Sequence, residues 1–522
     1  MKVVFRVDAS LEIGTGHVMR CLTLAHMLKK NGANVEFICR QHNGNLIDKI
    51  YSNGFIVHEL CISKESEIDA RLTYAPWLGV TQQTDADDCI DRIKTRIDWL
   101  IVDHYSLDYQ WQKRMRPCCK KLMVIDDLAD RKHQCDILLD QTFGRKKEDY
   151  LELVTEDCQL LLGSQYALLR PEFAEWRGIS IERRSRPELK QLLINMGGID
   201  IDNFTGQVLI ELKNCNLPSD LNITIVMGGS APHLDSVKSM AIELPYKTEV
   251  KVDVDNMAEI MANADIAIGA AGSSTWERCC LGLPTIQFVI AKNQLFSAET
   301  LAQHNIVKLA KEVKKAAYLL ESSPEWMKSF GLAAEEVCDG MGSNRVFNKM
   351  TDYKIILEKF GEFDLCSYVN LNENDKMLTL KMRNHPQVKK WMYNQDNITK
   401  KEHFEFIESL ASNINRCYFL VKQEEKLIGS VNFKNIRNNK PAIFGFYANP
   451  FEPILGAGRI LELVSLHFIF TELNLKKLTL EVLSNNKQVL NLHKKFGFKI
   501  VREKNKNGIK VFCMEKKSTD WK

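Results

Sequence analysis

The segment KVVFRVDASLEIGTGHVMR, residues 2–20, sets the fold of the first part of the chain. Its first six residues form a short apolar run, which is typical of a buried strand. A glycine-rich turn follows, and a helical pattern then runs from His17 to Lys30. A strand that leads through a glycine turn into a helix predicts the first βα unit of a parallel sheet.

Strand-like segments alternate with helical ones as far as about residue 345. Those before the polar stretch that contains Pro187 are 35–40, 99–105, 121–127 and 135–140, and those after it are 191–198, 222–229, 248–254, 264–272 and 284–290. Regular alternation of this kind predicts a parallel sheet with helices on its faces. We therefore expect two tandem Rossmann-like α/β domains, 1–185 and 186–345.

The pattern changes after residue 345. We expect a linker over 346–362, and then one α+β domain over 363–522. Residues 417–433 predict a β-hairpin, because two alternating runs flank the polar turn Gln423-Glu424-Glu425. Further strands are predicted at 442–448 and 476–483, each followed by a helical pattern. The predicted fold class is thus a pair of α/β domains followed by an α+β domain.

Composition limits the classes of function. The chain has 522 residues, of which 45% are hydrophobic and 26% charged, as in ordinary globular proteins. The formal net charge of +3 gives no sign of nucleic-acid binding. However, residues 363–522 carry 27 basic and 16 acidic side chains, whereas residues 1–362 carry 43 and 51. Such an asymmetry predicts two modules that bind different ligands.

Cysteine usage and hydropathy predict a cytoplasmic protein. The 15 cysteines are scattered and lack the spacing of a zinc site, so we expect reduced thiols and no metal. No run of 18 apolar residues is present, and the first residues run directly into a strand without a signal-peptide pattern. We expect neither a membrane nor a nucleic acid among the partners; the oligomeric state stays open.

The first glycine turn is a candidate catalytic site. Gly14 and Gly16 permit close approach of a ligand, and the helix that follows offers free N–H groups to an anion. His17 stands at the start of that helix, where the helix dipole favours the neutral imidazole. A neutral imidazole accepts a proton from water, which is the role of a general base. The alternative is a histidine that only caps or packs the helix.

A second candidate site is the segment IGAAGSSTWE, residues 268–277, at the end of a predicted strand. Small residues and hydroxyls there present donors to phosphate, and Glu277 is placed to accept both hydroxyls of a ribose. The turn at 196–200 supplies a second such surface in the same domain. Candidate phosphate-binding residues of the two turns are Gly197, Gly198, Gly272, Ser273, Ser274 and Thr275. The alternative is an ordinary strand–helix turn with a Ser/Thr cap.

These motifs carry a family resemblance. They are RVDASLEIGTGHVMRCLTLA (6–25), IVDHYSLD (101–108), CDILLDQ (135–141), YALLRPEF (166–173), MGGIDIDN (196–203) and AKNQ (291–294). In this order they resemble the UDP-2,4-diacetamido-2,4,6-trideoxy-β-L-altropyranose hydrolases of pseudaminic acid biosynthesis. The segment 269–277 also looks like the UDP-binding segment of peptidoglycan GlcNAc-transferases. The resemblance covers residues 1–345 and implies the GT-B architecture of nucleotide-sugar glycosyltransferases.

The resemblance implies a reaction and roles for residues. Water activated by His17 attacks the anomeric carbon with inversion and expels UDP, and Asp8 orients the water or His17. Arg20, Arg170 and Asn293 are implied as contacts to the sugar or the phosphates. Asp103 and His104 are weaker candidates for lining the same crevice. No divalent metal is implied, and we interpret Asp126-Asp127 as a structural turn rather than a metal site.

The C-terminal part carries a second resemblance. The loop ILGAGR (454–459), the helix that begins at Asn486 and the segment KMRNHPQVKKWM (381–392) are similar to GNAT N-acetyltransferases, including the one that acetylates the 4-amino group in the pseudaminic acid pathway. The implied acetyl-CoA contacts are Leu455, Gly456, Ala457, Gly458, Arg459 and Asn486. Two residues depart from the family pattern. Pro453 replaces a Gln or Arg, and His493 replaces the tyrosine that acts as general acid. Glu481 is a candidate base.

Together the two resemblances imply a bifunctional enzyme, whose acetylated product is the substrate of its own hydrolase. Its ligands are then acetyl-CoA and a UDP-sugar, and its pathway product, a nonulosonic acid, serves glycosylation such as that of flagellin. One alternative is a UDP-sugar glycosyltransferase joined to an acetyltransferase that acts on a protein N-terminus. Another is that the C-terminal domain binds ligand without catalysis.

Overall fold

The computed structural model describes residues 1–62, 71–350, 353–411, 413, 415–424, 426–436, 440–506 and 508–521. It divides into two compact units, Met1–Ser343 and Asn344–Lys522. The first unit contains two sheets and the second unit contains one. No helix in the described ranges is both long and apolar enough to cross a membrane.

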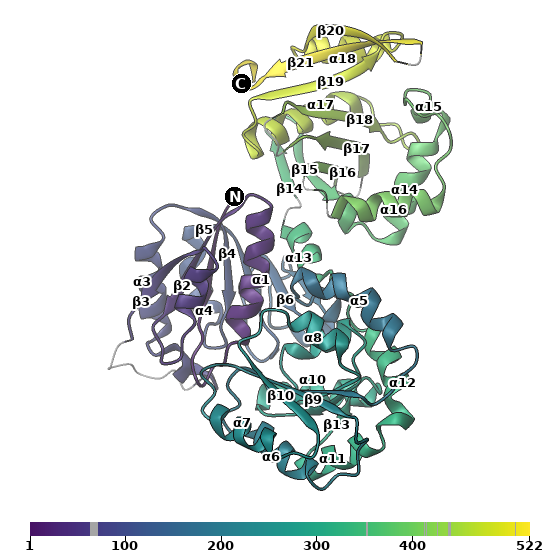
Figure 1. Ribbon diagram of the computed structural model, residues 1–522. Coiled ribbons are helices and arrows are strands. Elements are labelled where there is room, and N and C mark those ends of the chain that lie inside the picture. The colour runs from purple at the N-terminus through teal and green to yellow at the C-terminus, as the bar shows by residue number, and fades with distance from the viewer. Residues whose placement is uncertain are drawn as a thin grey trace. The chain divides into compact units, whose positions relative to one another are not determined.

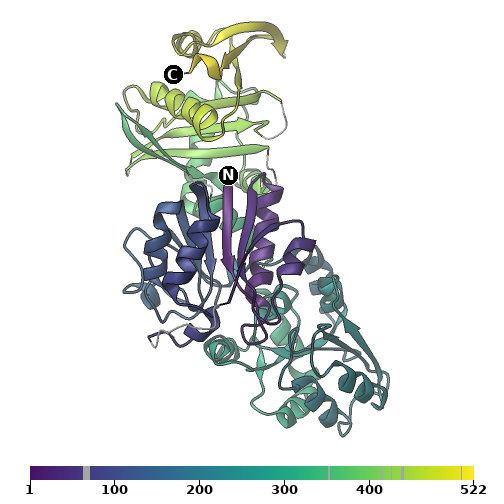
Figure 2. The ribbon, with the colours of Figure 1, turned by 90° about the vertical axis from the view of Figure 1, so that its left-hand side faces the viewer.

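The first lobe of the first unit is a seven-stranded parallel sheet in the order β3-β2-β1-β4-β5-β6-β7. Its elements are β1 (Lys2–Val7), α1 (Gly16–Lys30), β2 (Asn34–Arg40), α2 (Ile47–Ser52), β3 (Ile56–Leu60), α3 (Gln82–Arg92), β4 (Ile97–Asp103), α4 (Tyr109–Met115), β5 (Cys119–Ile125), β6 (Ile137–Asp140) and β7 (Gln159–Leu162). In Figure 2 the purple and blue helices of this lobe lie on both sides of its strands. Apolar runs such as Val3–Phe5 are buried because helices cover both faces of the sheet.

The second lobe is a six-stranded parallel sheet in the order β10-β9-β8-β11-β12-β13. Its elements are α5 (Pro171–Arg183), β8 (Gln191–Asn195), α6 (Phe204–Leu212), β9 (Asn222–Met227), α7 (Leu234–Ile242), β10 (Lys247–Val252), α8 (Met257–Asn263), β11 (Ile266–Ala270), α9 (Ser274–Cys280), β12 (Thr285–Phe288), α10 (Leu295–Gln303), β13 (Lys308–Leu309), α11 (Val313–Glu321) and α12 (Ser323–Glu335). The next helix, α13 (Gly342–Met350), begins in the first unit and ends in the second. Figure 1 shows these elements in blue-teal to green.

The helix α5 precedes the predicted junction at residue 185 but packs into the second lobe. Phe173 on α5 belongs to the apolar cluster that contains Leu193 of β8, and Ser180 Oγ donates to the carbonyl of Leu281 at 2.7 Å. Packing thus assigns α5 to the second lobe, because the apolar face of the helix is buried there.

The second unit contains an eight-stranded mixed sheet in the order β14-β15-β16-β17-β18-β19-β21-β20. Its elements are β14 (Tyr353–Leu357), β15 (Gly361–Ser367), α14 (Glu373–Asn384), α15 (Pro386–Lys389), α16 (Lys400–Ala411), β16 (Arg416–Gln423), β17 (Lys426–Lys434), β18 (Ala442–Ala448), α17 (Ala457–His467), β19 (Lys477–Leu483), α18 (Lys487–Lys495), β20 (Lys499–Lys506) and β21 (Ile509–Lys517). The only parallel pair among these described strands is β18 with β19. The predicted fold class, paired α/β domains followed by an α+β domain, is confirmed.

The linker predicted over 346–362 is wrong for its second half. Residues 353–357 form β14, which pairs with β15 in antiparallel register, and Ile355 is fully buried in the core of the second unit. The hairpin predicted at 417–433 is confirmed as β16 and β17, with Glu425 of its turn outside the described residues.

Candidate active site

The turn before α1 is held by its own side chains. Ser10 Oγ accepts from the backbone N–H of Ile13 at 2.9 Å, and Ser10 O accepts from that of Gly14. Gly14 has φ +79°, a left-handed conformation that strains other residues. This turn brings the N-terminus of α1, with its free N–H groups, to the carboxyl end of the first sheet.

His17 and Asp103 form a buried pair at this end of the sheet. The register of β1 and β4 places Asp103 beside Val7, so the carboxylate lies next to the start of α1. Its Oδ1 is 2.6 Å from His17 Nδ1. Burial by itself raises the pKa of Asp103, but the charges of Arg20 and His17 outweigh it and hold that pKa well below its usual range. An ionised carboxylate on Nδ1 orients the ring and leaves Nε2 for another partner.

Arg20, predicted as a ligand contact, also supports this pair. Its Nε donates to Asp103 Oδ2 at 2.6 Å, and its Nη1 donates to Asp127 Oδ2 at 2.9 Å. The hydroxyl of Tyr105 donates to the same Asp127, and the Tyr105 ring lies edge-on to the His17 ring at 4.7 Å between centroids. Arg20 therefore binds two carboxylates while it lines the cavity.

Asp8 does not orient His17 in the structure. Its side chain is fully buried, it pairs with Arg6 at 2.7 Å, and it accepts from the backbone N–H of Arg40 at 2.7 Å. His104 Nε2 lies 3.3 Å from its Oδ2. This charged cluster lies among the strands and does not line the cavity. The place predicted for Asp8 is occupied by Asp103.

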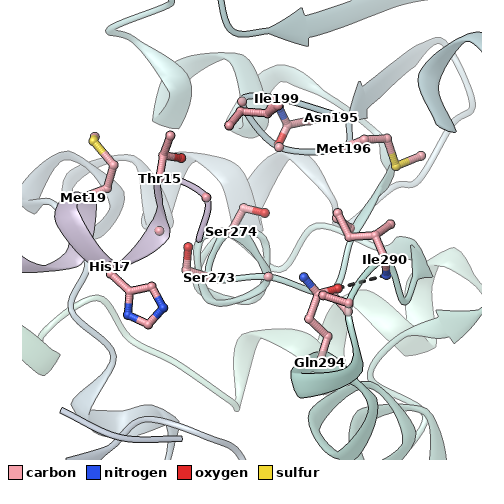
Figure 3. A pocket seen from close by; sticks show the side chains of 18 of the residues that line it. Thr15, His17, Met19, Asn195, Met196, Ile199, Ser273, Ser274, Ile290 and Gln294 are labelled. Atoms are coloured by element: carbon pink, nitrogen blue, oxygen red, sulfur yellow. Dashed lines mark hydrogen bonds between the residues drawn. The ribbon is translucent and has the colours of Figure 1, made fainter. Parts of the chain in front are cut away.

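The glycine turns of the second lobe face α1. A Cβ placed on Gly16 would lie 3.6 Å from Ser273 Oγ, and one placed on Gly198 would lie 3.7 Å from Thr15 Oγ1. Figure 3 shows His17 on α1 and Thr15 directly before that helix, with Ser273 and Ser274 of the second lobe around the same cavity. The two lobes therefore contribute to one site.

The start of α9 is supported from beneath by Arg278. This buried guanidinium donates to the carbonyl of Ala270 at 2.7 Å and to Ser274 Oγ at 3.0 Å, and burial lowers the pKa of Arg278 to about 10. Thr275, predicted as a phosphate contact, faces the interior instead. Its Oγ1 accepts from Gln287 Nε2 at 2.6 Å, and it does not line the cavity.

Glu277 and Arg170 lie at the cavity within reach of each other. Arg170 Nη2 is 3.7 Å from Glu277 Oε1 and its Nη1 is 3.2 Å from Glu172. Burial raises the pKa of Glu277, and the charge of Arg170 only partly opposes this effect. A carboxylate that is short of donors is suited to accept hydroxyl groups of a ligand.

The cavity has a volume of about 580 Å³, which is in the range of small-molecule sites. Predicted site residues that line it are Gly14, Gly16, His17, Arg20, Arg170, Gly197, Gly198, Gly272, Ser273, Ser274, Glu277 and Asn293. Asn293 Nδ2 donates to the Tyr105 hydroxyl at 3.4 Å, which joins the second lobe to the His17 surroundings.

The described residues contain no group of three or more His, Cys, Asp or Glu side chains arranged to hold a metal ion. Asp126 pairs with Arg131 at 2.8 Å and accepts from Tyr150, whereas Asp127 pairs with Arg20. These partners agree with the interpretation of Asp126-Asp127 as a structural turn.

The loop before α17 is the second candidate site. Gly456 has φ +82°, and a Cβ on it would meet nothing within 4 Å. The Leu455 side chain is fully exposed, and the Arg459 guanidinium lies over the Phe360 ring at 5.3 Å. Ala457 is buried, and a Cβ on Gly458 would lie 3.2 Å from Leu492 of α18. The loop thus presents open backbone next to the α17–α18 contact.

Two predicted acetyl-CoA site residues have structural partners. Asn486 caps α18, because its Oδ1 accepts from the Val489 backbone N–H at 3.3 Å. His493 is 4% exposed, and its Nδ1 lies 2.9 Å from Glu462 Oε1. Glu481, the candidate base, accepts from the Tyr393 hydroxyl at 2.5 Å and pairs with Lys504.

Sequence reasoning missed Tyr105 and Glu462 as site residues, and it interpreted Asp127 as part of a structural turn, whereas Asp127 lines the cavity. Tyr105 lies in the motif 101–108, just beyond the end of β4. That position at the end of a strand was the sequence signal that could have identified it as a site residue. Glu462 is a lone carboxylate among buried positions of α17, such as Leu461 and Val464, and this break in the apolar face was also visible in the sequence.

Two family models match the chain. The C-terminal domain model of glycosyltransferase family 28 matches residues 196–330, and the acetyltransferase (GNAT) domain model matches residues 368–499. An uncharacterized protein of Methanocaldococcus jannaschii is 25% identical over 516 residues, which covers 97% of this chain and 98% of that protein. The similarity to this protein therefore extends over both parts of the chain.

Two relatives are similar to one part each. The UDP-2,4-diacetamido-2,4,6-trideoxy-β-L-altropyranose hydrolase of Campylobacter jejuni is 31% identical, covering 58% of this chain and 97% of that protein. The acetyltransferase PseH of the same species is 33% identical, covering 27% of this chain and 86% of that protein. The chain belongs to the family of this hydrolase in its N-terminal part and to the GNAT acetyltransferases related to PseH in its C-terminal part, and it is an enzyme.

Proposed function

We propose that the chain catalyses two consecutive steps of pseudaminic acid biosynthesis. The second unit transfers the acetyl group of acetyl-CoA to the 4-amino group of UDP-4-amino-4,6-dideoxy-β-L-AltNAc. The first unit then hydrolyses the resulting UDP-2,4-diacetamido-2,4,6-trideoxy-β-L-altropyranose to the free sugar and UDP. Both steps use metabolites of the cytoplasm, where we place the enzyme.

One observation carries the hydrolase assignment: the imidazole of His17, held by Asp103 at 2.6 Å, stands at a cavity that both lobes line. With Nδ1 bound to the carboxylate, Nε2 accepts a proton from water, and Asp103 stabilises the imidazolium that forms. The hydroxide then attacks the anomeric carbon from the face opposite the diphosphate, with inversion.

The second lobe supports departure of UDP. The leaving diphosphate gains negative charge, which the N–H groups and hydroxyls of Gly272, Ser273 and Ser274 are placed to stabilise. Arg278 is buried and does not line the cavity; it donates to the carbonyl of Ala270 and so fixes the turn. Glu277 accepts hydroxyl groups of the ribose. This arrangement needs no divalent metal.

The positive charge of residues 363–522 and the open loop at Gly456 support the acetyltransferase assignment. Successive backbone N–H groups in such a loop bind the pyrophosphate of CoA. Acetylation converts the amine into an uncharged amide. In the proposed order this step comes before the hydrolysis that removes the nucleotide.

The test uses the full chain with UDP-4-amino-4,6-dideoxy-β-L-AltNAc, with and without acetyl-CoA, and follows the products by NMR. Without acetyl-CoA we expect no UDP. With acetyl-CoA we expect acetylation, followed by release of UDP and of the inverted free sugar.

His17→Ala should still acetylate the amine yet release no UDP. His26→Ala, on the same helix, is the matched control. UDP release without any acceptor would argue against a glycosyltransferase, and parental UDP release by His17→Ala would refute the base assignment.

A further inference from the structure

A buried acid–imidazole pair joins the two helices of the candidate acetyl-CoA site. Glu462 on α17 and His493 on α18 are 0% and 4% exposed, and Glu462 Oε1 lies 2.9 Å from His493 Nδ1. Glu462 Oε2 is buried and has no hydrogen-bond partner in the described part of the chain. A buried carboxylate without full compensation is costly, so its presence here calls for a reason beyond packing.

The pair stands where the sheet opens. β18 and β19 pair in parallel only at Ala442–Leu478 and Ile443–Thr479; beyond these residues they no longer pair with each other, although β17 and β21 still pair with them on their other sides. The His493 ring contacts Phe444 and Phe446, both on the part of β18 that does not pair with β19, at 5.8 Å between centroids. In open α/β sheets ligands bind beyond the carboxyl ends of parallel strands, and β18 and β19 separate toward that end.

The carboxylate also links this ring to the loop at the candidate cofactor site. Glu462 lies one turn into α17, the helix that begins directly after Gly456. The Lys516 ammonium on β21 interacts electrostatically with the same carboxylate. Of the two groups that interact with Glu462, His493 is the one whose ring contacts Phe444 and Phe446 of β18.

The chemistry of the pair follows from the occupied nitrogen. Because Nδ1 is bound to Glu462, Nε2 is the nitrogen left to meet a ligand. A carboxylate on Nδ1 stabilises the imidazolium, whose Nε2–H is a proton donor. A tyrosine hydroxyl at the position of His493 would be a proton donor without a carboxylate partner.

We infer that Glu462 is a positioning residue that holds His493 as the proton donor to the leaving CoA thiolate. The inference rests on the proposed acetyl transfer. The substrate amine nitrogen bonds to the acetyl carbon, the carbon–sulfur bond breaks, and the sulfur takes the proton from His493 Nε2. The proton that the amine loses returns the imidazole to its starting state, so the reaction balances as amine plus thioester to amide plus thiol.

The test is a double-mutant cycle in the full chain, with CoA thiol release as the assay. Glu462→Gln should lower kcat at least tenfold and leave the KM for acetyl-CoA within twofold, because the glutamine keeps the shape but not the charge. His493→Tyr supplies a donor that is independent of Glu462 and should keep measurable activity. In that tyrosine background Glu462→Gln should change kcat less than twofold.

A purely structural role predicts a different outcome. Glu462→Gln would then lower kcat equally in both backgrounds, or not at all, and either result overturns the inference. Circular dichroism of the full chain and an unchanged KM for acetyl-CoA report in each variant that the second unit, which carries both substitutions, is folded.

Imidazole NMR of the full chain separates this inference from the proposed function. We expect the His493 ring to show a protonated, hydrogen-bonded Nδ1 that changes in Glu462→Gln, and an unchanged signal overturns the positioning role. If the parent releases no thiol with the amino sugar, the proposed substrate is wrong. The role of His493 as proton donor in that transfer then fails together with the proposed substrate. The NMR result still decides whether Glu462 positions the His493 ring.

Discussion

Asp103→Asn tests the link between the buried pair and hydrolysis. The carboxylate accepts from His17 Nδ1 at 2.6 Å and from Arg20 at 2.6 and 2.7 Å. Asparagine fits the same space but carries no charge, and its amide group competes to donate toward Nδ1. The His17 ring then loses both its orientation and the charge that stabilises its imidazolium.

The expected loss is large. The same substitution behind a catalytic histidine lowers kcat about 10⁴-fold in a serine-protease triad. Here Arg20 keeps its second carboxylate, Asp127, so the surroundings are partly retained. We expect kcat for UDP release to fall about 10² to 10⁴-fold, or about 3 to 5 kcal/mol of transition-state stabilisation.

The assay is UDP release from the diacetamido UDP-sugar under saturating substrate, with circular dichroism to confirm folding. Asp98→Asn is the matched control, because it makes the same change at the opposite end of β4, away from the cavity. A folded Asp103→Asn chain whose kcat is within threefold of the parent value would refute the role of the pair.

The substitution also changes the dependence of stability on pH. The pKa of Asp103 is held below its unfolded-state value, so the native protein favours the carboxylate form. This contribution is present above the unfolded-state pKa of about 4 and is lost as the pH falls through the lower native value. The unfolding free energy of Asp103→Asn should therefore fall less than that of the parent on acidification.

Three further predictions concern the fold and its titration. Ile355→Ala should cost about 2–4 kcal/mol of unfolding free energy, while the exposed neighbour Ile356→Ala should cost less than about 1, measured by urea titration. Gly228→Ala should raise the KM of the hydrolase, because the added Cβ would meet the Gly198 carbonyl at 2.3 Å and displace its turn. Burial raises the pKa of Asp140 to about 6, so the parent should lose up to about 3 kcal/mol relative to Asp140→Asn as pH rises from 4 to 6; parallel pH curves would contradict this.

Local patterns were sufficient for most strands and for the hairpin at 417–433. Fully buried parallel strands such as β4 and β11 appear as continuous apolar runs, because both of their faces are covered. The short strand β14 was missed because it follows a helix end directly and looks like a loose connection. Its assignment needed the antiparallel partner β15, which supplies its hydrogen bonds.

For the candidate sites too, local features could be predicted from the sequence, whereas contacts between distant residues could not. The glycine turns and His17 were predictable, since a helix start after a strand is a local feature with a known use. The partner of His17 was not. Asp8 directly follows β1 and Asp103 is the last residue of β4, and the choice between them depends on where the two side chains point.

By itself, the amino-acid sequence determined the two-part organisation, the fold classes and the turns that can bind phosphate, because periodicity and glycine placement act over a few residues. Only the tertiary structure decided which carboxylate faces which imidazole: Asp103 for His17 and Glu462 for His493. Those pairs join residues 86 and 31 positions apart, and strand register and helix packing alone bring their atoms within hydrogen-bond distance.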